Sequence, residues 1–428
     1  MKYKQIVVFL FLSFSLPYLY SQSVVKQWTL EECINYAFEH NLDIKKVQLS
    51  EQEDEIDRKQ AIAAFFPSLS GSISQNYTHG QDAEGWSGSY SLGANVDLFR
   101  GLKNYRTLQQ TKLQKEQTAT SIQQKQYDIK ISITQSYLQI LYYQEALDIA
   151  RKNMEVAQSQ MERGKVLLEA GTSSKSEYAA LQAQFAAMST QVVTAQNALD
   201  NKKLQLKQLL ELGIDDQMDI ESFEIQESQI LATLDDKKQI YQKALQNMPE
   251  MRMAELNKEM SALNYKLAIS NCLPSLTLGG SIGTSNVYNT AQDFGEQMKN
   301  QFRQSLSLSL SVPIFTKLQT YATIQKAKLQ QQSVVYDYAI AEKNMLQTIE
   351  SLYQDALAAQ AQYLSSKQQL EAVELSYELV ADKFNLGMQN ATDILVERNN
   401  LNIAQQNVLQ AKFTALLSQL VLNIYQGV

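Results

Sequence analysis

The chain has 428 residues, of which 15 are Gly and 5 are Pro, and its formal net charge is −7. So few Gly and Pro residues exclude a loop-rich or all-β protein of this length, and 44% hydrophobic residues exclude a disordered chain. The mean hydropathy of −0.30 excludes a polytopic helical membrane protein. Because the sequence has no basic patch, nucleic acid is not expected as a partner.

Residues 1–21 have the features of a secretory signal peptide. Lys2 and Lys4 precede an apolar run over residues 6–16, and Ser21 is a small residue suited to cleavage before Gln22. The run is too short for a stable anchor, and no later stretch approaches 18 apolar residues. Cleavage would remove two Lys and no acidic residue, giving −7 − 2 = −9. We expect an exported protein whose membrane contact does not use helices.

One half of the chain repeats the other. "FPSL" (Phe66–Leu69) returns as "LPSL" (Leu273–Leu276), and "VDLF" (Val96–Phe99) returns as "VPIF" (Val312–Phe315). Twelve positions from residue 129 to 168 are spaced alternately by four and three residues, and ten of them are apolar. At the twelve positions 216 residues later, eleven are apolar. A heptad pattern kept over this length predicts supercoiled helices.

The two copies predict the same order of elements. The first structural repeat, residues 22–212, holds a helix over 29–66, a β-hairpin over 67–99, a long helix over 102–170 and a return helix over 176–210. The second repeat, residues 235–428, holds a helix over 235–272, a hairpin over 274–314, a long helix over 317–386 and a return helix over 392–425. Residues 213–234 are predicted to be an irregular connector between the repeats.

The segment "SLSLSLSVP" (Ser305–Pro313) predicts a strand with one apolar and one polar face, because residues alternate with period two. Leu306, Leu308, Leu310 and Val312 form the apolar face, which we expect to contact lipid. A strand can cross lipid only within a closed barrel, and four strands are too few to close one. The chain must then share strands with copies of itself. A small soluble sandwich packed on the helices is the alternative that the pattern leaves open.

Catalytic chemistry finds little support in the sequence. His40 and His79 are the only histidines, and they lack metal-ligand spacing and a neighbouring thiol. "GGSIG" (Gly279–Gly283) lies inside a predicted strand, where small residues suit a lumen better than a phosphate loop. We therefore predict no catalytic residue, no metal site and no cofactor. A periplasmic structural or adaptor coiled-coil protein is the alternative, and it leaves the strands without a role.

Four segments carry a resemblance to a known family. They are "TLEECINYAFEHNLDI" (Thr29–Ile44), its echo "ALQNMPEM" (Ala244–Met251), and the turns "EAGTSSKSEY" (Glu169–Tyr178) and "NLGMQNATDI" (Asn385–Ile394). Together with the Pro-Ser-Leu starts of both hairpins, they resemble the TolC-like outer-membrane efflux proteins over the whole mature chain.

The resemblance implies a mainly α fold with β: a homotrimer whose 12-stranded outer-membrane β-barrel continues into a periplasmic α-helical barrel. It implies the exit duct of a tripartite efflux or type I secretion system. The expected partners are a periplasmic adaptor (membrane fusion protein), an inner-membrane RND, ABC or MFS pump, and outer-membrane lipid. The sequence does not separate drug, metal and protein as cargo.

The resemblance also places a constriction at the periplasmic end. In the family, acidic residues six positions after each turn glycine narrow the pore, and here these are Glu177 and Asp393. Three copies of each would form a ring that attracts cations and can bind divalent ions. A second interpretation is that both are first-turn carboxylates favoured by helix dipoles, and the two roles are compatible.

The chain departs from the family at this end. Phe384 and Gln389 replace the Tyr and Arg that hold family members closed, so packing is expected to hold the closed state instead. Val396, with Glu397 beside it, replaces a second Asp. The exposed turns are the expected adaptor contacts, through Gly171, Thr172, Ser173, Gly387, Met388 and Asn390.

Overall fold

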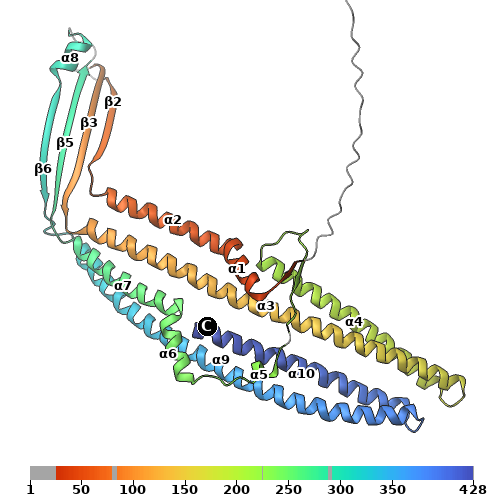
Figure 1. The fold of residues 1–428 in the computed structure, drawn as a ribbon. Helices are drawn as coiled ribbons and strands as arrows, with labels where there is room; N and C mark the ends of the chain where they lie inside the picture. The colour runs from red at the N-terminus through yellow and green to blue at the C-terminus, as the bar shows by residue number, and fades with distance from the viewer. Residues whose placement is uncertain (1–25, 80–83, 224, 288–291, 428) are drawn as a thin grey trace, which may run out of the picture.

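The computed structural model describes residues 26–79, 84–223, 225–287 and 292–427 (Figure 1). The signal peptide expected over residues 1–21 lies outside this part. The molecule is elongated, with a sheet at one end and long helices that run away from it to two turns at the other. No helix of the described residues combines the length and the apolar character needed to cross a membrane.

The first repeat follows the predicted order of elements. Its elements are β1 (Lys26–Trp28), α1 (Leu30–His40), α2 (Leu42–Ala63), β2 (Ser68–His79), β3 (Glu84–Arg100), α3 (Lys103–Glu169) and α4 (Lys175–Leu209). The second repeat contains α6 (Lys237–Asn247), α7 (Pro249–Ser270), β5 (Ser275–Val287), α8 (Phe294–Asn300), β6 (Arg303–Ser311), α9 (Gln319–Asn385) and α10 (Ala391–Gln426). The long helices α3 and α9 each have 67 residues.

The helix predicted over residues 29–66 is wrong as a single element. The capping box of Thr29 and Glu32 starts α1 as predicted. Asn41 then has an extended backbone (φ −60°, ψ 129°), and its side-chain oxygen accepts hydrogen bonds from the N–H groups of Asp43 (2.9 Å) and Ile44 (3.3 Å). The helix predicted over 235–272 is likewise divided, because Pro249 begins α7.

The connector is also more ordered than predicted. It contains β4 (Met218–Ile220) and α5 (Glu227–Ile230), and β4 pairs in parallel with β1. The hydroxyl of Tyr137, from α3, donates to the carbonyls of Trp28 (3.2 Å) and Glu221 (2.7 Å). Burial raises the pKa of Tyr137. This small sheet is therefore fixed to the middle of the long helix.

The main sheet is antiparallel with the strand order β2-β3-β5-β6. Helices α2, α3, α7 and α9 continue beneath it in the same order, each packed on the next. All 24 heptad positions predicted on α3 and α9 are buried or half-buried, which confirms the seam. Towards the turns, α4 packs on α3 and α10 packs on both α9 and α3.

The two faces of the sheet differ as the alternation predicts. In the register, Leu308 pairs with Leu278, which pairs with Val96, so apolar residues share one face. On the opposite face the hydroxyls of Ser281 and Ser305 are 2.8 Å apart. Leu306 and Leu308 are 80% and 64% exposed, and Val312, just beyond β6, is also exposed.

The exposed leucines distinguish a sheet with an open apolar face from a small soluble sandwich packed on the helices. Leu310 on the same face is exposed too, and among the described elements the short helix α8 is the one that lies against this sheet. No second layer covers the leucines within the described part of the chain, which argues against the small soluble sandwich. The chain by itself leaves an apolar sheet face open to its surroundings.

Candidate functional site at the helical turns

Both turns at the far end of the helices are built on a glycine with a left-handed backbone. Gly171 has φ 74° and Gly387 has φ 71°. The N–H of Gly171 donates to the carbonyl of Leu168 and that of Thr172 to Leu167, both at 3.0 Å, which is a Schellman cap. A Cβ at either glycine would meet no atom within 4 Å, so the backbone conformation alone requires glycine.

Glu177 serves the first turn as a capping residue of α4. Its N–H donates to Ser174 Oγ (3.2 Å), while its Oε2 accepts from the Ser174 N–H (2.8 Å) and from the Ser173 hydroxyl (2.7 Å). The backbone hydrogen bond from Ser174, followed by that from Ser173, lowers the pKa of Glu177. The carboxylate is therefore charged at neutral pH, and one of its oxygens is tied to the loop.

Asp393 occupies the equivalent position on α10. Its N–H donates to Asn390 Oδ1 (2.9 Å), and its Oδ2 accepts from Gln389 Nε2 (2.6 Å). Both predicted acidic residues thus lie in the first turn of a return helix, where the helix dipole favours negative charge. The structure also brings Gln389 and Asp393, two of the predicted site residues, into direct contact.

Phe384 joins the two repeats by packing. It is 5% exposed and belongs to a cluster with Leu181 of α4 and with Ala391 and Ile394 of α10, with Met161 of α3 against it. The ring of Phe384 therefore fills an apolar contact between the repeats. The turns remain accessible: Gly171, Thr172, Gly387, Met388 and Asn390 are exposed, and Ser173 is half-buried.

A buried polar contact between the repeats was missed by the sequence analysis. Arg398 of α10 is 5% exposed and donates from Nη2 to Asn153 Oδ1 of α3 (2.6 Å), with its guanidinium 5.2 Å from the centre of the Tyr377 ring. The Tyr377 hydroxyl accepts from Gln160 Nε2 (3.1 Å). The signal was present, since Arg398 lies four residues after Ile394 on the buried stripe of its helix.

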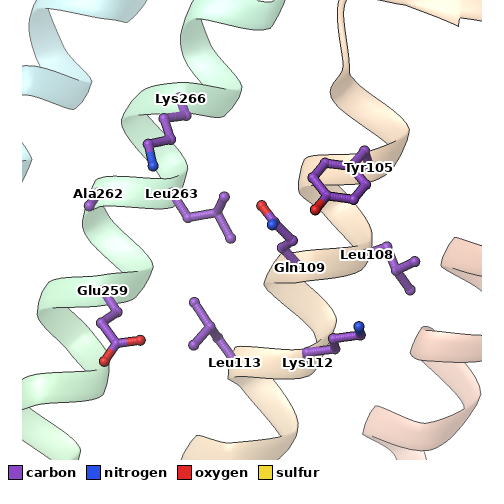
Figure 2. A pocket seen from close by; sticks show the side chains of 9 residues that line it. All are labelled: Tyr105, Leu108, Gln109, Lys112, Leu113, Glu259, Ala262, Leu263 and Lys266. Carbon is purple, nitrogen blue, oxygen red and sulfur yellow. The ribbon is translucent and has the colours of Figure 1, made fainter.

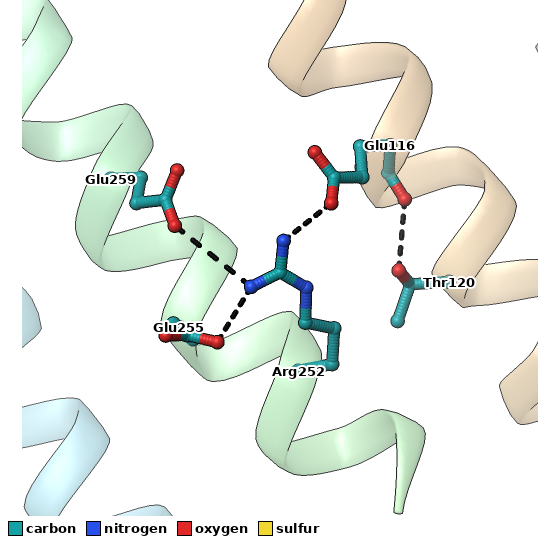
Figure 3. A network of polar contacts seen from close by, with 5 residues as sticks. All are labelled: Glu116, Thr120, Arg252, Glu255 and Glu259. Carbon is teal, nitrogen blue, oxygen red and sulfur yellow. Dashed lines mark hydrogen bonds and ion pairs between the residues drawn. The ribbon is translucent and has the colours of Figure 1, made fainter.

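Nearer the sheet, charged side chains join α3 to α7. Arg252 of α7 contacts Glu116 of α3, and its Nη1 is 2.6 Å from Glu255 and 3.9 Å from Glu259 (Figure 3). The two glutamates nearest it raise the pKa of Arg252 through hydrogen bonds. The described residues contain no group of His, Cys, Asp or Glu that could hold a metal ion.

A groove beside this network also lies between the repeats. It has a volume of about 490 Å³ and is lined by α3 and α7 side chains, including Tyr105, Leu108, Leu113 and Leu263, with Lys112 and Lys266 at its margins (Figure 2). These side chains are mostly aliphatic and aromatic. The groove is a packing feature of the helix pair, without the converging groups of a catalytic site.

Comparison with known proteins matches the chain along nearly its whole length. The sequence model of the family described as outer membrane efflux protein matches residues 33–211 and 240–425. The outer membrane protein TolC of Vibrio cholerae is 22% identical over 374 residues, covering 84% of this chain and 82% of TolC. The outer membrane efflux protein BepC of Brucella suis is 19% identical over 410 residues, covering 92% and 84% of the two chains.

Solved structures show the same fold. The transmembrane channel CusC superposes with a TM-score of 0.80 at 17% identity, covering 94% of this chain and 92% of CusC. The outer membrane protein VceC of Vibrio cholerae gives 0.79 at 17% identity, covering 93% and 96%. The chain therefore has the fold of these outer-membrane proteins. Because the family model matches both repeats, the chain belongs to the outer membrane efflux protein family, and its location is the outer membrane.

Proposed function

We propose that this protein is the exit duct of a tripartite efflux or type I secretion system. Three copies form a 12-stranded barrel in the outer membrane and a helical tunnel across the periplasm. The duct is a passive conduit: an inner-membrane RND, ABC or MFS pump supplies the energy and a periplasmic adaptor connects the two. The duct itself catalyses no reaction. Membership of the efflux family supports the transport role.

The observation that carries this proposal is the incomplete sheet. Strands β2 and β6 are the two edges of the four-stranded sheet, and the face bearing Leu306 and Leu308 is exposed. Unpaired strand edges cannot remain open in hydrocarbon, where water is absent and each unsatisfied backbone group costs several kcal/mol. Pairing β2 of one copy with β6 of the next satisfies both edges. Such a head-to-tail contact generates a ring when the rotation closes.

The outermost helices support the same arrangement. Leu42, Leu49 and Ile56 recur every seven residues on α2, and all three are about 60% exposed or slightly more. On α9, Leu329 and Tyr336 are also exposed at a spacing of seven. Since α2 and α9 lie at opposite sides of the helix layer, a ring that joins β2 to β6 also brings these two stripes together.

In the ring, the turns form the periplasmic opening. The carboxylates of Asp393 and Glu177 lie in the first turns of α10 and α4, and three of each would stand around the axis as a cation-selective constriction. Asp393 is the stronger candidate because its carboxylate accepts one hydrogen bond, from the Gln389 side chain, whereas that of Glu177 accepts two, from Ser173 and the Ser174 backbone. The exposed turn residues, with Met388 at 73% exposure, are proposed to contact the adaptor.

Extraction and gel migration test this proposal against the alternative of a periplasmic coiled-coil protein. The channel is expected to leave the outer-membrane fraction with detergent alone and to migrate faster without boiling than after it, since a folded barrel resists detergent. A protein released by osmotic shock, soluble without detergent and insensitive to boiling would contradict the proposal and favour the structural coiled coil.

A further inference from the structure

The short helix α8 packs against β5, at the end of the sheet farthest from the long helices (Figure 1). Thr284 has the same orientation on β5 as Ile282 and Leu278, because it lies an even number of residues away. Its hydroxyl donates to the carbonyl of Met298 (2.7 Å), and the Phe294 ring meets the Tyr90 ring edge to face at 6.5 Å. Helix α8 is therefore docked on the leucine face of the sheet and away from the serine face.

Gln297 holds this helix in place. It is 9% exposed, its Oε1 accepts from the N–H of Val287 (2.8 Å), and its Nε2 donates to the carbonyl of Gln292 (2.9 Å). Asn286 is buried beside it, 2% exposed. The buried amides of Gln297 and Asn286 therefore form a polar contact between α8 and the end of the sheet.

The chemistry of α8 excludes the hydrocarbon interior. A helix of seven residues leaves most of its terminal N–H and C=O groups without intrahelical partners, and these need water or head groups. Asp293, Glu296 and Lys299 are exposed on it. Phe294 of α8 and nearby Phe302 are each about half exposed, which suits the boundary between head groups and acyl chains.

The length of the apolar face of the sheet agrees with a position of α8 at the membrane boundary. From Thr284 to Ser275 there are nine steps along β5, which at roughly 3.3 Å each gives about 30 Å. Strands tilted by roughly 40° would span about 23 Å of membrane, close to the band of about 25 Å typical of outer-membrane barrels. Phe99, paired with Leu276 on the same face, marks the other limit of the band.

We infer that α8 is an interfacial helix whose partner is the bilayer surface. It lies on the lipid side of the sheet among the head groups of the outer leaflet, with the rings of Phe294 and Phe302 at the start of the acyl chains. This inference rests on the proposed function, because it requires the sheet to span the membrane.

Lipid-depth quenching of single tryptophans tests it. The chain has two Trp residues, so Trp28→Phe with Trp86→Phe gives a background into which Phe294→Trp or, as the band-centre control, Leu308→Trp is placed. The assembled protein is reconstituted in phosphatidylcholine vesicles brominated either near the head group or near the end of the chain. Phe294→Trp is expected to be quenched more by the shallow bromines, and Leu308→Trp more by the deep ones.

The outcomes separate the inference from the proposed function. If Leu308→Trp is quenched and Phe294→Trp is not, or if Phe294→Trp responds more to deep bromines, α8 is not interfacial although the sheet spans the membrane. If neither is quenched, the membrane-spanning sheet itself is refuted. Adding Gln297→Ala to Phe294→Trp should release α8 and abolish the shallow quenching, whereas Glu296→Ala, at an exposed neighbouring position, should leave it unchanged.

Discussion

The sheet and the helical turns stand at opposite ends of the same long helices, and they use apolar side chains in opposite ways. At the turns, Phe384 and Leu181 are 5% and 2% exposed, and the capping box of α4 and the Asn390 cap of α10 satisfy helix-end groups within the chain. In the sheet, Leu306 and Leu308 are exposed, and the outer edges of β2 and β6 are unpaired within the described part of the chain. The turns can therefore form in one copy, whereas the proposed channel requires lipid and further copies to complete the sheet.

The largest effect is expected where the turn region depends on packing. Phe384→Ala removes a buried ring from the contact between the repeats, and such truncations cost about 3–5 kcal/mol. Hydrogen exchange should quicken around residues 160–185 and 380–395, and the channel should open more often in planar bilayers. Phe315→Ala, at a largely exposed position, is the control. Equal exchange in the two variants would show that Phe384 does not hold the turns together.

The next effect separates the two faces of the sheet. Leu308→Arg places a charge on the proposed lipid face, which costs about 2–4 kcal/mol near the middle of a bilayer. Ser309→Arg places the same charge on the opposite face, because neighbouring strand residues point to opposite sides. The fraction that shifts on boiling in gels should fall for the first variant and change little for the second. Similar losses for both would remove the distinction between a lipid face and a lumen.

A smaller effect is expected at the turn glycines. Gly387→Ala keeps all contacts, since its Cβ would meet open space, but it places a Cβ in the left-handed region at a cost of about 1–2 kcal/mol. Thermal unfolding of the assembled protein should shift down slightly, with Gly387→Asn nearer to the wild type because Asn tolerates this conformation. An unchanged transition for Gly387→Ala would contradict the strained turn.

Charge at the constriction should affect conduction more than stability. Asp393→Asn is expected to lower the cation selectivity and the block by divalent ions in single-channel recordings, because the ring loses its negative charges. Glu177→Gln is the matched comparison, and it should change selectivity less and the order of the first turn more, since Glu177 completes a capping box. If Asp393→Asn conducts with unchanged selectivity and divalent block, Asp393 does not form the constriction.

The smallest effect concerns pH. Hydrogen bonds from Arg58, and next from Lys115, lower the pKa of Glu55 to about 2. Because the folded pKa lies below the usual value of 4.5, this carboxylate stabilises the fold above that pH, and the contribution is lost as pH falls from about 4.5 to 2. Glu55→Gln should flatten the dependence of the unfolding transition on pH in this window. Identical pH profiles for the two proteins would contradict the role of Glu55.

The sequence predicted most of the regular elements because their signals are long. The helices predicted over residues 102–170 and 317–386 are found at Lys103–Glu169 and Gln319–Asn385, since a heptad stripe extends through each. The pairing of β1 with β4 was not predicted. Each of these strands has three residues, too few to show a period, and about 190 residues separate them in the chain.

The helix ends that carry the proposed constriction were located from the sequence, whereas the role of their residues stays a prediction. The turn glycines and the first-turn carboxylates follow local rules for helix ends, so they could be located from sequence. The break at Asn41 was missed because Asn is tolerated within helices as well as at their ends. The contact of Arg398 with Asn153 joins residues 245 positions apart, and only the folded structure shows that they meet.

A closed ring requires β2 of one copy to pair with β6 of the next, and cysteine cross-linking tests this pairing directly. In a background of Cys33→Ala with Cys272→Ala, Ser307→Cys on β6 is combined in turn with Ser70→Cys, Ser72→Cys or Ser74→Cys on β2. At the matching register, oxidation in the membrane should give bands of one, two and three chains and none larger. Monomers alone at every register, or a ladder that continues beyond three, would contradict a closed ring of three copies.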